Sequence, residues 1–150
     1  IRERMMNRYS KYLNNLSPKN CGVIDMDIVL EVNADNWDRE VLQSDVLTVV
    51  DFWHVHCSWC HALNPVLDEI ASEYRGKVRF AKIDVLKNPA NREIAVRYGV
   101  MGTPTLISFC NGRPVDVAVG FAPKDHIRHR LDDLIVKHKE CIKQSTQLKF

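Results

Sequence analysis

The stretch WHVHCSWCH, residues 53–61, contains two cysteines separated by two residues, with three histidines around them. A cysteine pair at this spacing is typical of a redox couple, a metal site or a haem attachment site. The preceding apolar run, VLTVVDFW at 46–53, predicts a strand that is buried on both faces. The following segment, HALNPVLDEIASEYRG at 61–76, predicts a helix bent by Pro65. The cysteine pair is therefore expected between a buried strand and the start of a helix.

The position of the pair favours redox chemistry. Cys57 is expected at the amino end of the helix, where unpaired N–H groups and the helix dipole stabilise a thiolate. The spacing places Cys60 one turn further along, within reach to form a disulfide with Cys57 or to resolve a mixed disulfide. Ser58, His56 and His61 make the surroundings more polar than those of a cysteine pair in a core. The sequence thus predicts that Cys57 attacks and Cys60 resolves.

Asp51 is an unexpected acid within the buried run VVDFW. Burial is expected to raise the pKa of its carboxyl, so that Asp51 can accept or return a proton for Cys60. A second interpretation is a buried ion pair with Lys82, which lies in the next predicted strand. The two interpretations are compatible.

A proline loop is predicted at the same end of the sheet as Cys57. Thr103 and Pro104 stand at the entrance to a strand. Most X–Pro bonds are trans, but a cis bond at Pro104 would place a bend opposite the sulfurs. Such a bend would leave the backbone of Thr103 free to pair with an extended substrate peptide.

The whole chain reads as an α/β domain with a mixed central sheet, helices on both faces and an extra N-terminal helix. Strands are predicted at 27–32, 46–53, 78–84, 105–110 and 115–120, and helices at 1–16, 34–44, 61–76, 89–99 and from 123 to 142. Asn33 or Asp35 is expected to cap the second of these helices. Asn111–Gly112 predicts a hairpin turn, and Pro114 predicts an edge strand.

Composition sets limits on size and partners. The chain has 150 residues, 45% of them hydrophobic, which is enough for one ordinary core, and no apolar run suggests a membrane span. The net charge of +2 gives no reason to expect nucleic acid or membrane contact. The predicted divisions are a helical extension and linker at 1–25, the domain at 26–142 and a polar tail at 143–150. Because the chain opens at Ile1, a native start is expected to be missing, so an exported or anchored form stays open while a cytoplasmic location is favoured.

Three cysteines stand apart from the pair. An odd total of five cysteines argues against a disulfide-stapled secreted framework. Cys110 is predicted to be a small buried hydrophobe, and Cys141 an exposed bystander. Cys21, in the linker, is read as a bystander, with a regulatory or intermolecular thiol as the alternative.

From about Asp27 to Ile142 the chain resembles the thioredoxin family. Besides the cysteine pair, six features match the family's buried acid, helix kink, buried lysine, cis-proline loop, hairpin glycine and active-site glycine: Asp51, Pro65, Lys82, Thr103–Pro104–Thr105, Gly112 and Gly120. The resemblance implies a thioredoxin fold and thiol–disulfide exchange on proteins bearing disulfides or dithiols, without a cofactor. It also implies an upstream electron donor or acceptor, such as a thioredoxin-reductase-like protein, and substrate contacts at Trp59, Thr103, Pro104 and Gly120.

The chain departs from the family within the motif. Thioredoxins usually read W-C-G-P-C-K, whereas residues 56–61 read HCSWCH. His61, one turn after Cys57, is hypothesised to stabilise the thiolate as a cation, which would make the pair more oxidising. Trp59 either caps the sulfurs, contacts a protein partner or packs locally, and Ser58 either bonds the thiolate or caps the helix. With His56, these residues are expected to tune the direction of electron flow.

Two other kinds of functional site are compatible with the sequence around the cysteine pair. CSWCH is the string of c-type haem attachment, but a haem also needs a distal ligand and an apolar pocket. His54, His56, Cys57, Cys60 and His61 supply donors for Zn²⁺ or Cu⁺, although the turn would have to relax to bring them together. The redox interpretation is preferred to both the haem and the metal alternative.

Overall fold

The computed structural model describes residues 28–139 and 141. The helix predicted at 1–16, the linker with Cys21 and the polar tail at 143–150 lie outside the described residues. Within the described part, no helix is long and apolar enough to cross a membrane.

The described residues contain a five-stranded sheet in the order β1-β3-β2-β4-β5. The strands are β1 (Val29–Val32), β2 (Leu47–Trp53), β3 (Val78–Asp84), β4 (Thr105–Cys110) and β5 (Arg113–Val119). β3 pairs in parallel with both β1 and β2, whereas β4 runs antiparallel to β2 and to β5. The predicted mixed sheet, parallel first and closed by a hairpin, is confirmed.

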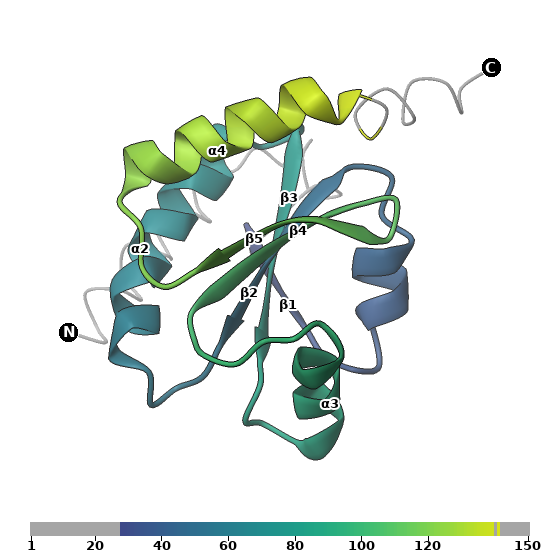
Figure 1. The fold of residues 1–150 in the computed structure, drawn as a ribbon, viewed down its shortest axis with the longest axis vertical. Helices are drawn as coiled ribbons and strands as arrows, with labels where there is room; N and C mark the ends of the chain where they lie inside the picture. Colours follow the sequence, from purple (N-terminus) through teal and green to yellow (C-terminus); the bar gives the residue numbers. More distant parts are fainter. Residues whose placement is uncertain (1–27, 140, 142–150) are drawn as a thin grey trace, which may run out of the picture.

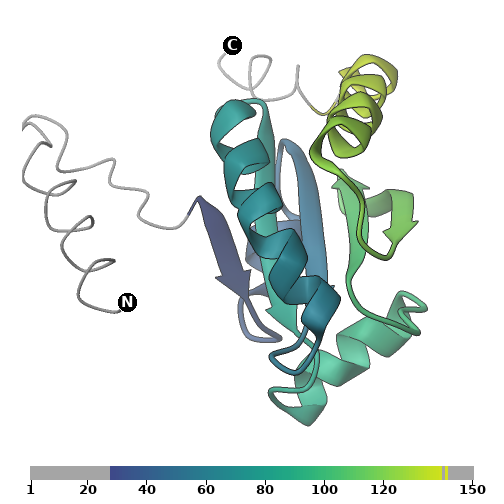
Figure 2. The same ribbon diagram turned by 90° about the vertical axis from the view of Figure 1, so that its left-hand side faces the viewer.

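Helices cover both faces of this sheet. α2 (Ser58–Glu73) and α4 (Lys124–Lys137) lie on one face, and η2 (Asp38–Leu42) and α3 (Pro89–Arg97) lie on the other, as Figure 1 shows. Figure 2 shows the same layers from the side, with α2 in front of the strands. The two-sided cover explains why β2 and β4 are apolar almost throughout.

Alternation along the strands divides the core into two clusters. In β2, Val49 faces the cluster under α2 and α4, while Val50 and Phe52 face the cluster under η2 and α3. By the same alternation Asp51 lies on the side of α2. The strand therefore directs its single carboxylate toward the helix that carries the cysteine pair.

The first helix after β1 differs from the prediction. It is a short π-type turn over Asp38–Leu42, and neither Asn33 nor Asp35 caps it. Instead the Asn33 side chain accepts hydrogen bonds from the N–H groups of Asp35 and Asn36, at 2.8 and 3.2 Å, in a turn before the helix. Trp37 and Val41 are both fully buried, so core packing rather than a side-chain cap fixes where this helix lies.

The predicted hairpin joins β4 to β5. Asn111 and Gly112 have φ values of 53° and 77°, the left-handed pair that a tight two-residue turn requires. A Cβ at Gly112 would lie 2.8 Å from the carbonyl oxygen of Leu42, so the turn also packs closely on η2. β5 is an edge strand, as Pro114 predicted.

The two described cysteines outside the Cys57–Cys60 pair are both buried. Cys110 ends β4 and is 3% exposed, so its predicted burial is confirmed. It is not merely a small hydrophobe, however, because its sulfur is paired with that of Cys141. Cys141, beyond the end of α4, is 0% exposed and belongs to the core cluster under α2 and α4. The prediction of an exposed Cys141 is therefore wrong, because the chain turns back after α4 and places this residue in the core.

Candidate redox site

The cysteine pair lies where the sequence places it. Cys57 has extended backbone angles and is the N-cap of α2, four residues after β2 ends at Trp53. Its Sγ accepts a hydrogen bond from the N–H of Cys60 at 3.2 Å. The two sulfurs form a disulfide across a Cα–Cα distance of 5.2 Å. In the reduced state, the same N–H groups at the helix start favour a thiolate at Cys57.

The two sulfurs differ in exposure. Cys57 is 9% exposed, whereas Cys60 is 0% exposed and faces the core. Attack on a disulfide requires that the incoming sulfur approach in line, so access decides which cysteine meets a substrate first. Only Cys57 of this pair has that access.

Asp51 lies on the face of β2 that α2 covers. It is buried, and neither carboxylate oxygen has a hydrogen-bond partner among the described residues. Burial raises the pKa of Asp51 to about 7, and the nearby Lys82 ammonium offsets part of that rise. A carboxyl that titrates near neutral pH can both accept and return a proton under physiological conditions.

Lys82 stands beside Asp51 on β3, since the two residues are register partners. Its Nζ lies 5.3 Å from the centroid of the Trp53 ring. Asp68 on α2 also interacts with Lys82: burial raises the pKa of Asp68, and the Lys82 charge lowers it. The sequence reasoning missed Asp68. Its position two turns after Cys60, on a helix predicted to pack over Asp51, is the signal that could have found it.

The proline loop closes one side of the site. The Thr103–Pro104 bond is cis, as the sequence analysis expected. Gly120, with φ +89°, donates its N–H to the carbonyl oxygen of Pro104 at 2.8 Å and so ties the end of β5 to the loop. Among the described residues, no backbone hydrogen bond outside the strands engages Thr103. Its backbone N–H and carbonyl are therefore available to an incoming chain.

The histidines do not converge on the sulfurs. The His61 ring donates from Nε2 to the carbonyl oxygen of Val55 at 2.6 Å and stands edge-on to Trp53. The N–H of His56 donates to Nδ1 of His54 at 3.2 Å. Within 28–139 and 141, no group of three or more His, Cys, Asp or Glu residues is placed to hold a metal ion. The five residues proposed as alternative metal ligands are thus not arranged as a metal site in the described part of the chain.

Trp59 projects outward from the first turn of α2. It is 63% exposed, and its ring lies 5.6 Å from that of Phe121, which follows Gly120. Phe121 is also exposed. Phe121 was not among the residues predicted from the sequence, although its position next to the predicted active-site glycine, Gly120, was a signal for it. Ser58 and His56 are also exposed.

Comparison with known proteins identifies the family. The family model described as thioredoxin matches residues 28–133. The chain belongs to the thioredoxin family. It is a thioredoxin-type thiol–disulfide oxidoreductase with Cys57–Cys60 as its redox pair.

Relatives agree with this assignment. Thioredoxin from Staphylococcus aureus is 45% identical over 107 residues, which cover 71% of this chain and 97% of that protein. Thioredoxin 1 from Nostoc sp. is 38% identical over 107 residues, with the same shares covered. Thioredoxin from Staphylococcus haemolyticus is 43% identical over 104 residues, 69% of this chain and 95% of that protein. The thioredoxin fold expected from the sequence is therefore confirmed.

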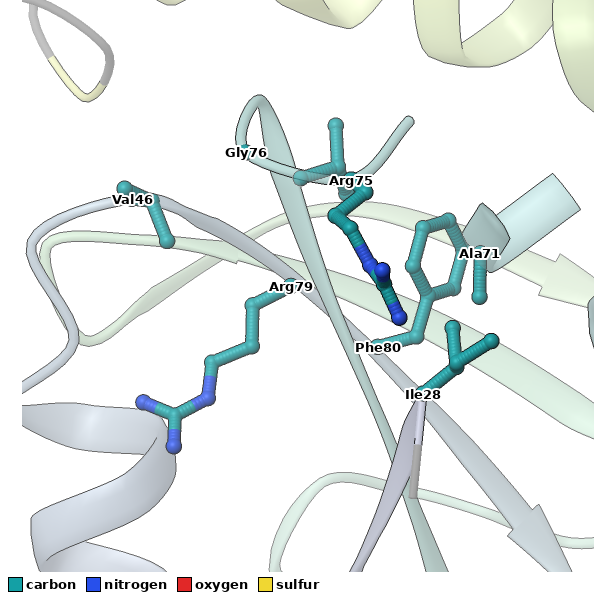
Figure 3. A pocket seen from close by; sticks show the side chains of 8 residues that line it. Ile28, Val46, Ala71, Arg75, Gly76, Arg79 and Phe80 are labelled. Carbon is teal, nitrogen blue, oxygen red and sulfur yellow. The ribbon is translucent and has the colours of Figure 1, made fainter. Parts of the chain in front are cut away.

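Two of the surface pockets formed by the described residues of this thioredoxin-family domain differ in their distance from the redox site. One, of about 290 Å³, borders the proline loop and is lined in part by His54, Leu86, Arg92, Met101 and Thr103. It extends the active-site surface along the loop. The other, of about 270 Å³, lies near the beginnings of β2 and β3 and contains Arg75 beside Phe80 and Ile28 (Figure 3). Because Cys57 follows the opposite end of β2, this second pocket is separate from the redox site.

Proposed function

We propose that Cys57 is the attacking sulfur and Cys60 the resolving sulfur in exchange with disulfides of protein substrates. The Cys57 thiolate attacks one substrate sulfur, forms a mixed disulfide and releases the other sulfur as a thiolate. Cys60 then attacks Sγ of Cys57, which reforms the Cys57–Cys60 disulfide and frees the substrate as a dithiol. The observation that carries this order is the difference in exposure, 9% for Cys57 against 0% for Cys60.

Asp51 is proposed to take the proton that Cys60 loses when it attacks. Cys60 is a core-facing residue of α2, and Asp51 lies on the strand face that α2 covers. A carboxyl whose pKa is about 7 is half ionised near neutral pH, so it can act as a base in one direction and an acid in the other. Lys82 is proposed to hold the ionised form of Asp51 by its charge.

Substrate recognition is proposed to use a short stretch of extended peptide beside Cys57. The free backbone groups of Thr103 can pair with that peptide as a strand edge does, while Pro104 and Gly120 fix the loop. Trp59, two residues after Cys57, offers an exposed apolar surface supported by Phe121. The pocket beside Met101 can accept a substrate side chain.

His56, Ser58 and His61 are proposed to tune the reduction potential. All three lie within the first turn of α2 or directly before it, where charge and dipole act on Cys57. The hydrogen bond from His61 to Val55 fixes the ring beside the loop that precedes Cys57. A cation at that point favours the thiolate and makes the disulfide easier to reduce.

The electron partner is proposed to be a thioredoxin-reductase-like protein that re-reduces the Cys57–Cys60 disulfide. The cytoplasmic location favoured by the sequence analysis stays a prediction. Both the electron partner and the location depend on whether the pair donates or accepts electrons. The reduction potential of the Cys57–Cys60 pair, measured against glutathione, would show which of the two it does.

The order of attack is tested by two serine variants. With a disulfide-bonded reporter peptide, Cys57→Ser should abolish turnover and form no adduct. Cys60→Ser should also lose turnover but accumulate a mixed disulfide between the peptide and Cys57. Cys21→Ala serves as the control for loss of a thiol and should turn over like the parent. An adduct on Cys60 in the Cys57→Ser variant, with none on Cys57 in the other, would reverse the proposed order.

A further inference from the structure

A second pair of sulfurs meets in the core, away from the redox site. Cys110, the last residue of β4, and Cys141, four residues after α4 ends, are joined as a disulfide across a Cα–Cα distance of 5.8 Å. The N–H of Cys141 donates to the carbonyl oxygen of His138 at 3.1 Å, which holds the returning turn. Both cysteines belong to the apolar cluster under α2 and α4.

This pair cannot exchange with the catalytic pair of the same molecule. β4 is antiparallel to β2, with Phe109 opposite Thr48, so Cys110 lies at the start of β2. Cys57 follows the other end of β2. Seven residues of strand separate the two ends, which is about 20 Å. Oxidation or reduction of one pair therefore does not pass to the other through a direct sulfur contact.

We propose that Cys110 and Cys141 form a second, non-catalytic disulfide that fastens the end of α4 to the sheet and stays closed while Cys57–Cys60 cycles. Two features support a structural role. The sulfurs are buried, at 3% and 0% exposure, so a dissolved thiolate cannot reach them in the folded domain. The bond also closes a loop with a sequence separation of 31, which restricts the unfolded chain.

The bond forms by exchange with a disulfide oxidant, either a small-molecule disulfide or a protein disulfide. One cysteine thiolate attacks the oxidant and releases the first reduced thiol. The second cysteine attacks that mixed disulfide and releases the second thiol, so two protons and two electrons pass to the oxidant. The cytoplasmic location predicted from the sequence is then compatible only with a cytosol that supplies such an oxidant.

Peptide mapping of the full chain tests the pairing. The oxidised protein is denatured with an alkylating reagent present and digested, and we expect a linked peptide containing Cys110 and Cys141. Under native conditions and increasing dithiothreitol, Cys57 and Cys60 should become alkylated first, while the second pair opens only in unfolded protein. Free Cys110 and Cys141 in the oxidised protein, a link to Cys21, or opening of both pairs together would overturn the proposal.

Stability gives an independent measurement. The double variant Cys110→Ala, Cys141→Ala should lower Tm by about 10 °C in non-reducing buffer, the order expected for loss of such a loop constraint. Cys21→Ala is the control and should keep the parent's Tm. Turnover of the reporter peptide at 25 °C should stay equal to the parent's in both, which separates this proposal from the catalytic one. An unchanged Tm in the double variant would contradict the proposed fastening.

Discussion

The carboxyl of Asp51 is buried on the face of β2 that α2 covers, and its pKa is raised to about 7 because burial disfavours its charge. A carboxyl whose pKa is higher in the folded state than in the unfolded chain stabilises the fold only while it is protonated. That contribution is complete below 3.8, the ordinary pKa of an aspartate, and is lost as pH rises to about 7. At alkaline pH the folded protein therefore contains a costly buried charge.

Asp51→Asn should remove this penalty. We expect the variant's free energy of unfolding to exceed the parent's by up to about 4 kcal/mol at pH 8, and to match it near pH 3.5. Urea denaturation across this range, with the disulfides intact, measures the difference. Asp45→Asn, an exposed acid, is the control and should show no such trend. If Asp51→Asn raised the free energy of unfolding equally at pH 3.5 and pH 8, the gain would come from packing and not from the loss of a charge.

Variants of His61 test whether the charge of its ring or its hydrogen bond to the Val55 carbonyl sets the reduction potential of the Cys57–Cys60 pair. A cationic ring near the helix start should stabilise the Cys57 thiolate, so His61→Ala should lower the reduction potential of the pair by about 30 mV. Equilibration of each variant with glutathione measures this potential. His61→Gln can still donate to the Val55 carbonyl and should follow the alanine variant. Equal potentials for the parent and His61→Ala would show that the His61 cation does not tune the pair.

Trp59 and Phe121 should act as one apolar surface for substrates. Trp59→Ala is expected to lower kcat/KM about tenfold for peptide disulfides with apolar flanks, because an aromatic contact of this size is lost. Reduction of a small disulfide such as hydroxyethyl disulfide should be unchanged. Phe121→Ala should lower kcat/KM less when Trp59→Ala is already present than it does in the parent, because the two rings contact one another. Strict additivity, or equal loss on the small disulfide, would contradict a shared peptide surface.

At the scale of elements, the hairpin after β4 depends on space as well as on backbone angle. Gly76 and Gly112 both have positive φ, but only at Gly112 would a Cβ meet another segment, the Leu42 carbonyl at 2.8 Å. Gly76→Ala should cost about 1–2 kcal/mol for conformation alone. Gly112→Ala should cost about 1–3 kcal/mol more, because η2 or the hairpin has to move. Urea denaturation of both variants gives the comparison, and equal costs would show that the contact with Leu42 is readily relieved.

The elements best predicted from the sequence are those with strong local signals. The apolar run of β2, the Asn111–Gly112 turn and the start of α3 at Pro89 each rest on residues that act within their own segment. η2 was predicted less well because the burial of Trp37, a contact with distant strands, decides its start. Local capping rules cannot include that contact.

At the scale of the whole molecule, the site could be anticipated where the strand order brings residues together. Asp51 and Lys82 meet because β2 and β3 are parallel neighbours, which the alternating pattern predicted. Phe121 and Asp68 were missed because their partners come from other elements. Cys141 was misjudged for the same reason: nothing in the charged segment around it shows that the chain returns to β4.

The central claim is that the fold makes one sulfur of the pair available and ionised while it shields the other. The rate of alkylation of each cysteine in the reduced protein at neutral pH, followed by mass spectrometry, measures this directly. The account predicts that Cys57 reacts well before Cys60, and faster than a free cysteine in an unfolded peptide of the same sequence. Faster reaction at Cys60, or a Cys57 no more reactive than in the unfolded peptide, would contradict it.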